Sequence, residues 1–260
     1  MILVFDVGNT ETTVGLFEGE ALRRHWRLRT DPARTPDELG LALRALLLAA
    51  AVEPPAVRGV AIGSVVPALT EPLAEACRAL VAGVAPIIVD ARSPLPITLD
   101  VLEPLTVGAD RIINTLAASR LFGADTIVVD LGTATTYDCI TADGVFLGGV
   151  IAPGVRTSAE TLFRRTSKLP ATELVAPPRA IGRRTEDCVR AGIVFGAADT
   201  VDGLVRRIKA EWPTPRDPLV IATGGLAPML APLCATVDRV EPHLTLVGLR
   251  IAFELLSGQG

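Results

Sequence analysis

The sequence predicts an α/β protein made of two similar halves. Apolar runs of strand length alternate with amphipathic, helix-length segments along the 260 residues. The segment at 2–8, ILVFDVG, has a counterpart at 126–132, TIVVDLG, and a threonine-rich turn follows each. We therefore expect a duplicated pair of domains, over 1–115 and 116–260, with a cleft between them. The boundary falls near a helix that the pattern predicts over 110–121.

Local signals define the elements of the first half. The apolar run Ile2–Val7 indicates a buried strand, and Thr12–Phe17 follows a Gly-Asn-Thr turn, which indicates a hairpin. Ala21–Arg29 is a candidate third strand. A helix should begin at Thr35, where a Thr-x-x-Glu capping box coincides with a proline at the first helical position, and run to about Ala51. A strand over 60–66, a helix over 71–81 and a strand over 86–89 complete this half.

The second half repeats that order. Strands are predicted over 126–130, 135–141, 145–150 and 219–222, and helices over 158–165, over 185–211, after Gly225 and after His243. This is the pattern of a second domain with the same opening hairpin.

Composition excludes several classes of protein. The net charge is −4 and no basic run is present, so the electrostatic footprint of nucleic-acid binding is missing. No apolar run approaches the ~20 residues of a membrane span, and the N-terminus does not resemble a signal peptide, which predicts a soluble, cytoplasmic protein. The scattered cysteines, Cys77, Cys139, Cys188 and Cys234, indicate buried free thiols. No P-loop or dinucleotide-binding glycine motif occurs.

Two aspartates stand at the ends of apolar strands. Burial of Asp6 or Asp130 is costly unless each carboxylate meets a cation or several donors. Gly8 and Gly132 then permit close approach, and the hydroxyl-rich turns offer donors for phosphate oxygens. Two such turns are suited to hold a nucleotide from opposite sides, although each alone is also compatible with an ordinary hairpin turn.

The segment Gly108–Arg111 begins a predicted helix. Asp110 is either a proton acceptor for a substrate hydroxyl or an acidic residue favoured by the helix dipole, and Arg111 suits an anionic group on a substrate. The local chemistry leaves both interpretations open.

Several ordered motifs together resemble the type III pantothenate kinases, within the superfamily of acetate and sugar kinases, heat-shock cognate ATPases and actin that includes the Bvg accessory factors. The resemblance runs nearly end to end and rests on DVGNT at 6–10, SVVP at 64–67, GADR at 108–111, DLGTATT at 130–136, GGVIAPG at 148–154 and TGG at 223–225.

The resemblance implies two actin-like (ribonuclease H-like) domains and ATP-dependent phosphorylation of pantothenate, the first step of coenzyme A biosynthesis. It implies that Asp110 is the proton acceptor and that Asp130 binds a monovalent cation, potassium or ammonium. Magnesium accompanies ATP, with Asp6 as a ligand, and the family is dimeric. ATP contacts are implied for Asp6, Val7, Gly8, Asn9, Thr10, Glu11, Thr12, Thr13 and Thr133. Pantothenate contacts are implied for Val101, Gly108, Ala109, Asp110, Arg111 and Thr185.

Two departures from the family pattern stand out. Val101 occupies a place where the family has tyrosine, so a substrate contact is lost or supplied differently, and Glu11 adds a carboxylate for which we expect an outward, structural role. Two alternatives remain: a kinase for another small hydroxylated acid, and a nucleotide-binding regulator without catalysis.

Overall fold

The computed structural model describes residues 1–258 and divides into two compact units. The first comprises residues 1–120 together with the C-terminal segment from Leu244, and the second comprises Leu121–His243. This division differs from the predicted one at 115/116, because the C-terminal helix packs in the first unit and contacts its two central strands. The chain therefore passes from the first unit to the second and returns.

The sheet of the first unit has the order β3-β2-β1-β4-β5. Its strands are β1 (Ile2–Val7), β2 (Glu11–Glu18), β3 (Ala21–Arg29), β4 (Gly59–Ser64) and β5 (Ile87–Val89). The first three strands are antiparallel neighbours, whereas β4 and β5 join in parallel. All five strands were predicted within a few residues. A short strand outside this sheet, β6 (Thr98–Leu99), was not predicted.

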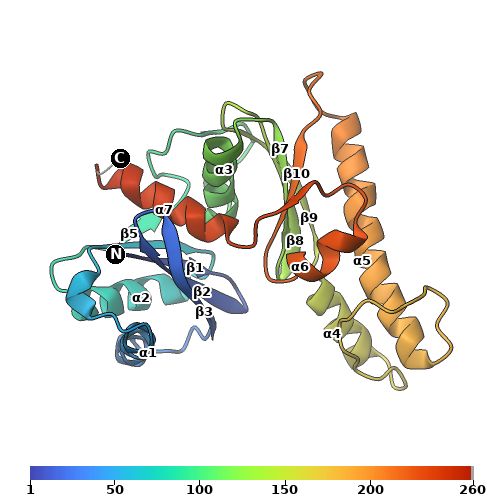
Figure 1. Cartoon of the computed structure of the whole chain (residues 1–260), viewed down its shortest axis with the longest axis horizontal. Coiled ribbons are helices and arrows are strands. Elements are labelled where there is room, and N and C mark those ends of the chain that lie inside the picture. The colour runs from blue at the N-terminus through green and yellow to red at the C-terminus, as the bar shows by residue number, and fades with distance from the viewer. Residues whose placement is uncertain (259–260) are drawn as a thin grey trace. The chain divides into compact units, whose positions relative to one another are not determined.

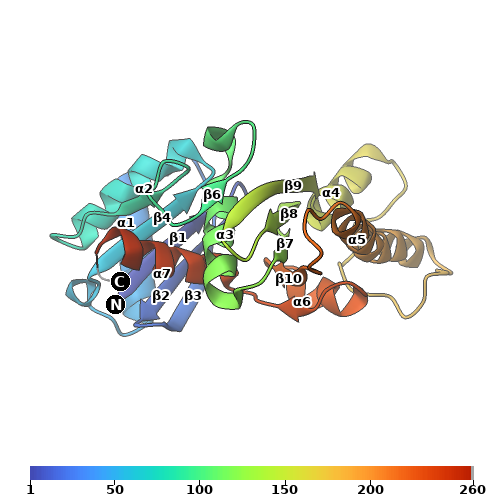
Figure 2. The same cartoon turned by 90° about the horizontal axis from the view of Figure 1, so that it is seen from above.

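Helices cover both faces of this sheet (Figures 1 and 2). Side chains alternate along β1, so Leu3, Phe5 and Val7 pack with α1 (Pro36–Ala49) and α2 (Pro67–Leu80). Val4 faces the other way, toward α3 (Ala109–Phe122) and α7 (Leu244–Leu256). The predicted capping box starts α1: Glu38 N donates to Thr35 Oγ1 at 3.3 Å and Thr35 N donates to Glu38 Oε2 at 2.9 Å.

The second unit repeats this topology. Its strands run in the order β11-β10-β7-β8-β9, and they are β7 (Thr126–Leu131), β8 (Ala134–Ile140), β9 (Val145–Pro153), β10 (Leu219–Thr223) and β11 (Arg239–Val240). As β1 does, β7 pairs antiparallel with the next strand and parallel with a later one. One face packs against α4 (Val155–Arg165), α5 (Thr185–Ala210) and α6 (Ala227–Leu230). Short 3-10 turns occur in the first unit at Pro54–Ala56 and Pro104–Thr106, and in the second unit at Ala231–Leu233.

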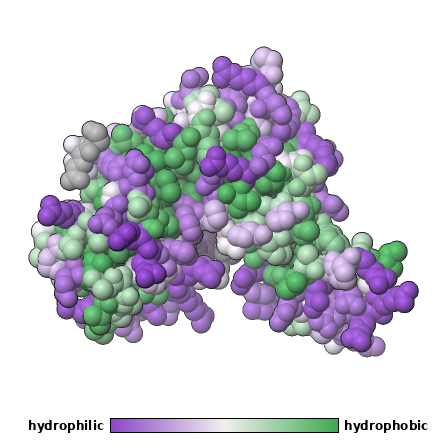
Figure 3. All heavy atoms as spheres, viewed as in Figure 1, coloured by the Kyte–Doolittle hydropathy of each residue, from purple (hydrophilic) through white to green (hydrophobic). Residues whose placement is uncertain are grey.

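The surface mixes polar and apolar residues. Hydrophilic side chains occupy much of the face in Figure 3, with apolar ones among them. Within residues 1–258, no helix combines the length and apolarity that a membrane crossing requires. No disulfide joins any of the four cysteines, all of which lie within the described residues, and Cys77 and Cys139 are buried as expected. The expectation of a buried thiol is wrong for Cys188, which is exposed near the start of α5, and Cys234 is only half-buried.

Candidate functional site

The first predicted turn follows β1. Asp6 is half-buried at the end of that strand, paired with Thr13 on β2 and Gly63 on β4. Because side chains alternate along a strand, Asp6 lies on the same face as Val4, the face that α3 and α7 cover. The turn is closed by the Gly8 amide, which donates to Glu11 O at 3.1 Å. A Cβ at position 8 would stand 3.0 Å from that carbonyl oxygen, which explains the glycine.

The acceptor segment lies at the same edge of this sheet. The Val65 amide, just beyond β4, donates to Val7 O at 3.0 Å, and a Cβ built on Gly108 would lie 3.4 Å from the Val65 side chain. One turn into α3, Ile113 fills the space above Gly63, the strand neighbour of Asp6. Asp6 and Asp110 therefore both belong to the carboxyl edge of the sheet, on its α3 face.

Asp110 has the electrostatics of a base. Burial raises the pKa of its carboxyl, and the Arg111 amide and guanidinium oppose this only in part, so the pKa stays above its ordinary value. Its Oδ1 accepts from the Arg111 amide at 2.9 Å. A carboxylate with a raised pKa holds a proton more readily, which favours it as the acceptor for a hydroxyl proton.

The second unit contains the counterpart of Asp6. Asp130 is paired with Thr136 on β8 and Thr223 on β10, the positions that Thr13 and Gly63 occupy around Asp6. The Gly132 amide closes the turn by donating to Ala134 O at 3.1 Å, and this turn is one residue shorter than the first. The predicted resemblance of the two turns is confirmed within each unit.

Glycines crowd the Asp130 carboxylate. Gly224 has φ +88° and its missing side chain would overlap Asp130 Oδ1, while a Cβ at Gly132 would lie 3.5 Å from the same oxygen. Only glycine at position 224 leaves Asp130 Oδ1 and the Leu131 backbone in their places. Hard cations bind carboxylate and carbonyl oxygens, so Asp130 fits a cation ligand.

The start of α4 supports the exposed Thr133. The Thr157 hydroxyl donates to Thr133 O at 2.7 Å, and Gly154 lies so close that a side chain there would overlap the same carbonyl. The motif around 148–154 therefore ends in a glycine required by contact with the turn. Thr157 was not among the residues singled out from the sequence.

The remaining predicted residues have varied surroundings. Glu11 is exposed, with an oxygen 3.8 Å from Arg27 Nε, in agreement with an outward role. Val101 is half-buried shortly before Pro104–Thr106, and Thr185 is the exposed first residue of α5. Thr12 is only 5% exposed and its hydroxyl contacts Thr30, a residue that sequence analysis missed. Among the described residues, no group of three or more histidine, cysteine or acidic side chains is arranged to hold a metal ion.

A groove of about 560 Å³ lies within the second unit, and it was not predicted. It runs between the β8–β9 region and the helices α4 and α5, and its lining is mostly apolar. Gly192 and Gly196 of α5 line it, and a Cβ at either position would meet open space.

The repeated topology, with an aspartate and a glycine turn at the end of each central strand, defines an actin-like fold of the kind found in ATP-dependent kinases. A solved structure agrees with this class: the activator of 2-hydroxyisocaproyl-CoA dehydratase from Clostridium difficile, solved with bound ADPNP, superposes with a TM-score of 0.57. The alignment covers 99% of this chain and 94% of that one at 14% identity, which supports the fold alone.

Sequence comparison is more specific. The model of the type III pantothenate kinase family matches residues 2–207. The type III pantothenate kinase of Frankia casuarinae is 47% identical over 98% of this chain and 99% of its own length, and that of Moorella thermoacetica is 44% identical over the same shares. The chain belongs to the type III pantothenate kinase family.

Proposed function

We propose that this protein transfers the γ-phosphoryl group of ATP to the primary hydroxyl of pantothenate, giving 4'-phosphopantothenate in the first step of coenzyme A biosynthesis. The observation that carries the proposal is the half-buried Asp110 carboxylate, with its raised pKa, at the same sheet edge as the Asp6 turn. A phosphate-binding turn and a hydroxyl-activating base are the two parts that such a transfer needs.

The nucleotide is assigned to the turn at 6–13 and to Thr133. In the first turn, the exposed Asn9 and Thr10 present donors to phosphate oxygens, and Gly8 keeps the backbone close. Phosphoryl transfer of this kind depends mainly on positioning and on neutralising charge, since its transition state is loose.

Cations complete the charge balance. We assign potassium or ammonium to Asp130, whose carboxylate Gly224 and Gly132 approach closely, and we assign Asp6 to the magnesium that accompanies ATP. When bound, such ions would offset the negative charge of the phosphate oxygens. The protein's own part is to hold two carboxylates at strand ends in matching positions.

The acceptor is assigned to the start of α3. Asp110 takes the proton of the pantothenate hydroxyl, while Arg111 and the amides from Gly108 and Ala109 bind its polar groups. Val101 and Thr185 are assigned to the same substrate. Val101 offers no hydroxyl where the family has tyrosine, so its contact is apolar.

A coupled assay of ADP release tests the function and separates the alternatives. With ATP, magnesium and potassium, we expect turnover with pantothenate and little with other hydroxy acids such as glycerate or pantoate. Turnover with a different acid alone would indicate the other kinase. Nucleotide binding without phosphorylation of any acceptor would indicate the regulator.

We also propose a cytoplasmic homodimer. The groove along α5 and the exposed apolar side chains of Ile151 (65%) and Ile181 (82%) in the second unit support association. Light scattering should give a mass of two chains. Gly196→Arg, which fills the groove, should shift that mass toward one chain, and an unchanged dimer would place the interface elsewhere.

A further inference from the structure

We propose that Thr30 is a positioning residue for the nucleotide turn: it sets the shape of residues 8–12 from outside the motif. The inference rests on the proposed function of that turn as the ATP site. Thr30 follows β3 directly, is 8% exposed, and bonds to three residues of the turn.

The backbone amide and the side-chain hydroxyl of Thr30 both donate hydrogen bonds to the turn. Its amide donates to Thr10 O at 3.0 Å, and its hydroxyl donates to Gly8 O at 2.7 Å. A hydroxyl has one proton, so the 2.9 Å contact between the Thr12 and Thr30 hydroxyls has Thr12 as the donor. The result is a hydrogen-bonded chain from Thr12 through Thr30 to Gly8.

This chain determines which groups of the turn remain for a phosphate. The carbonyl oxygens of Gly8, Thr10 and Glu11 all accept from protein donors, so they are held away from an anion that they would repel. The Thr12 hydroxyl donates its proton to the Thr30 hydroxyl. The Thr12 hydroxyl therefore stabilises the turn and does not donate to ATP. A turn with its carbonyl groups already oriented loses less entropy when it binds.

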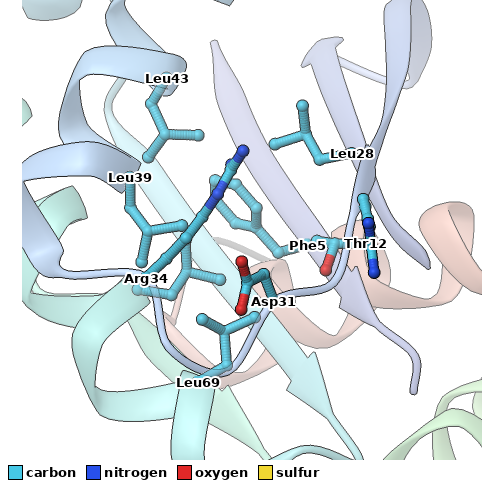
Figure 4. A pocket seen from close by; sticks show the side chains of 10 residues that line it. Phe5, Thr12, Leu28, Asp31, Arg34, Leu39, Leu43 and Leu69 are labelled. Atoms are coloured by element: carbon cyan, nitrogen blue, oxygen red, sulfur yellow. The ribbon is translucent and has the colours of Figure 1, made fainter. Parts of the chain in front are cut away.

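The surroundings of Thr30 are packed and leave no room for a ligand of their own. Thr12 lines a cavity of only about 10 Å³, space for about one water molecule, with Phe5, Leu28 and the loop residues Asp31 and Arg34. Figure 4 shows the Thr12 side chain on the same side as Phe5, with Asp31 beside it. The loop after Thr30 is fixed locally, since Ala33 N donates to Asp31 Oδ1 at 3.1 Å. Thr30 therefore lies between strand β3 and a loop that carries a hydrogen bond of its own.

The test replaces the hydroxyl and keeps the shape. Thr30→Val should weaken binding of a non-hydrolysable ATP analogue about tenfold in calorimetry of the full chain, because Gly8 O loses its donor. The KM for ATP should rise to match, with the KM for pantothenate unchanged. Thr30→Ser keeps the hydroxyl and should restore both values. Hydrogen exchange should quicken in the peptide containing residues 8–12 and not elsewhere.

Thr126→Val is the matched control, since Thr126 is fully buried and its hydroxyl donates to a local carbonyl, Ala124 O, at the opposite end of β7 from Asp130. It should leave nucleotide affinity unchanged. If Thr30→Val fails to fold, Thr30→Ala removes the hydroxyl with less bulk and gives the same readouts. Unchanged nucleotide affinity, or equal losses for ATP and pantothenate, would overturn the inference. A wild-type protein that binds nucleotide but does not phosphorylate pantothenate would refute the proposed function and leave the role of Thr30 testable by titration.

Discussion

Replacing Asp110 with asparagine should abolish most turnover while leaving the fold at least as stable at neutral pH. Base catalysis is worth roughly 10²- to 10⁴-fold in rate, and a loose transition state places the effect toward the lower end. The stability effect depends on two opposing contributions. Loss of a charge near a helix N-terminus costs ~0.3–1 kcal/mol, whereas removing a buried charge relieves the desolvation that raises the pKa of Asp110.

The raised pKa means that desolvation outweighs the favourable interactions. Between the unfolded value of 3.8 and the higher folded value, the native state binds more protons than the unfolded state, so the contribution of Asp110 to stability falls as pH rises through this window. Asparagine carries no charge at any pH. The variant should therefore gain stability relative to the wild type as pH rises from 4 to 7.

The assay pairs steady-state kinetics with urea unfolding at several pH values. Asp202→Asn is the control with the opposite sign: burial would raise the pKa of Asp202, but the Ala235 amide and the Thr236 hydroxyl and amide hold it below its usual value. That variant should lose stability at pH 7 and keep its kinetics. Near-normal turnover in Asp110→Asn would refute its role as the base, and destabilisation growing with pH would refute the electrostatic argument.

Three further predictions concern other parts of the chain. Burial alone would raise the pKa of the Asp125 carboxyl, but hydrogen bonds donated by Trp212, the Ala142 amide and Thr214 lower it. Asp125→Asn should therefore reduce the free energy of unfolding by about 1–3 kcal/mol at pH 7. Urea unfolding at several pH values should show this loss shrinking as the pH falls below 4. Gly224→Ala should raise the potassium concentration needed for half-maximal activity, because the new methyl group displaces Asp130 and a φ of +88° strains alanine. Gly203→Ala, on the open side of α5, is the control and should leave that concentration unchanged. If Gly224→Ala has the potassium dependence of the wild type, Asp130 does not belong to the cation site. Gly59→Ala should reduce the free energy of unfolding by about 1–3 kcal/mol, because its methyl group would overlap the Phe253 ring. Adding Phe253→Leu to the same chain should recover part of this loss. A double variant with no recovery would count against the packing argument.

Local signals predicted most of the fold. The strand at 2–7 lies where the apolar run places it, the candidate strand at 21–29 forms, and α1 starts where the capping box places it. The apolar run and the capping box both depend on residues close in sequence. The extent of the first unit was harder to predict. Helix α7 joins it through contacts such as that of Phe253 with Gly59, which are nearly two hundred residues apart and leave no periodic trace.

The candidate site shows the same limit. Asp6, Asp110 and Asp130 could be singled out because a carboxylate at the end of an apolar strand or at a helix start is conspicuous in sequence. Thr30 and Thr157 could not, since each is an ordinary threonine whose importance lies in its hydrogen bonds to a turn 18–24 residues away in sequence.

The two turns differ in the way they are supported, although their strands follow one pattern. In the first, Thr30, directly after β3, donates to the carbonyl of Gly8, and the turn has one residue more. In the second, Thr157 from helix α4 holds the carbonyl of Thr133, and Gly224 makes room for Asp130. A longer turn with exposed amide and hydroxyl donors suits the polyphosphate, whereas a shorter turn beside a carboxylate that two glycines approach closely suits a cation. Duplication thus accounts for the shared strand-end aspartates, and later differences in support account for their separate proposed tasks.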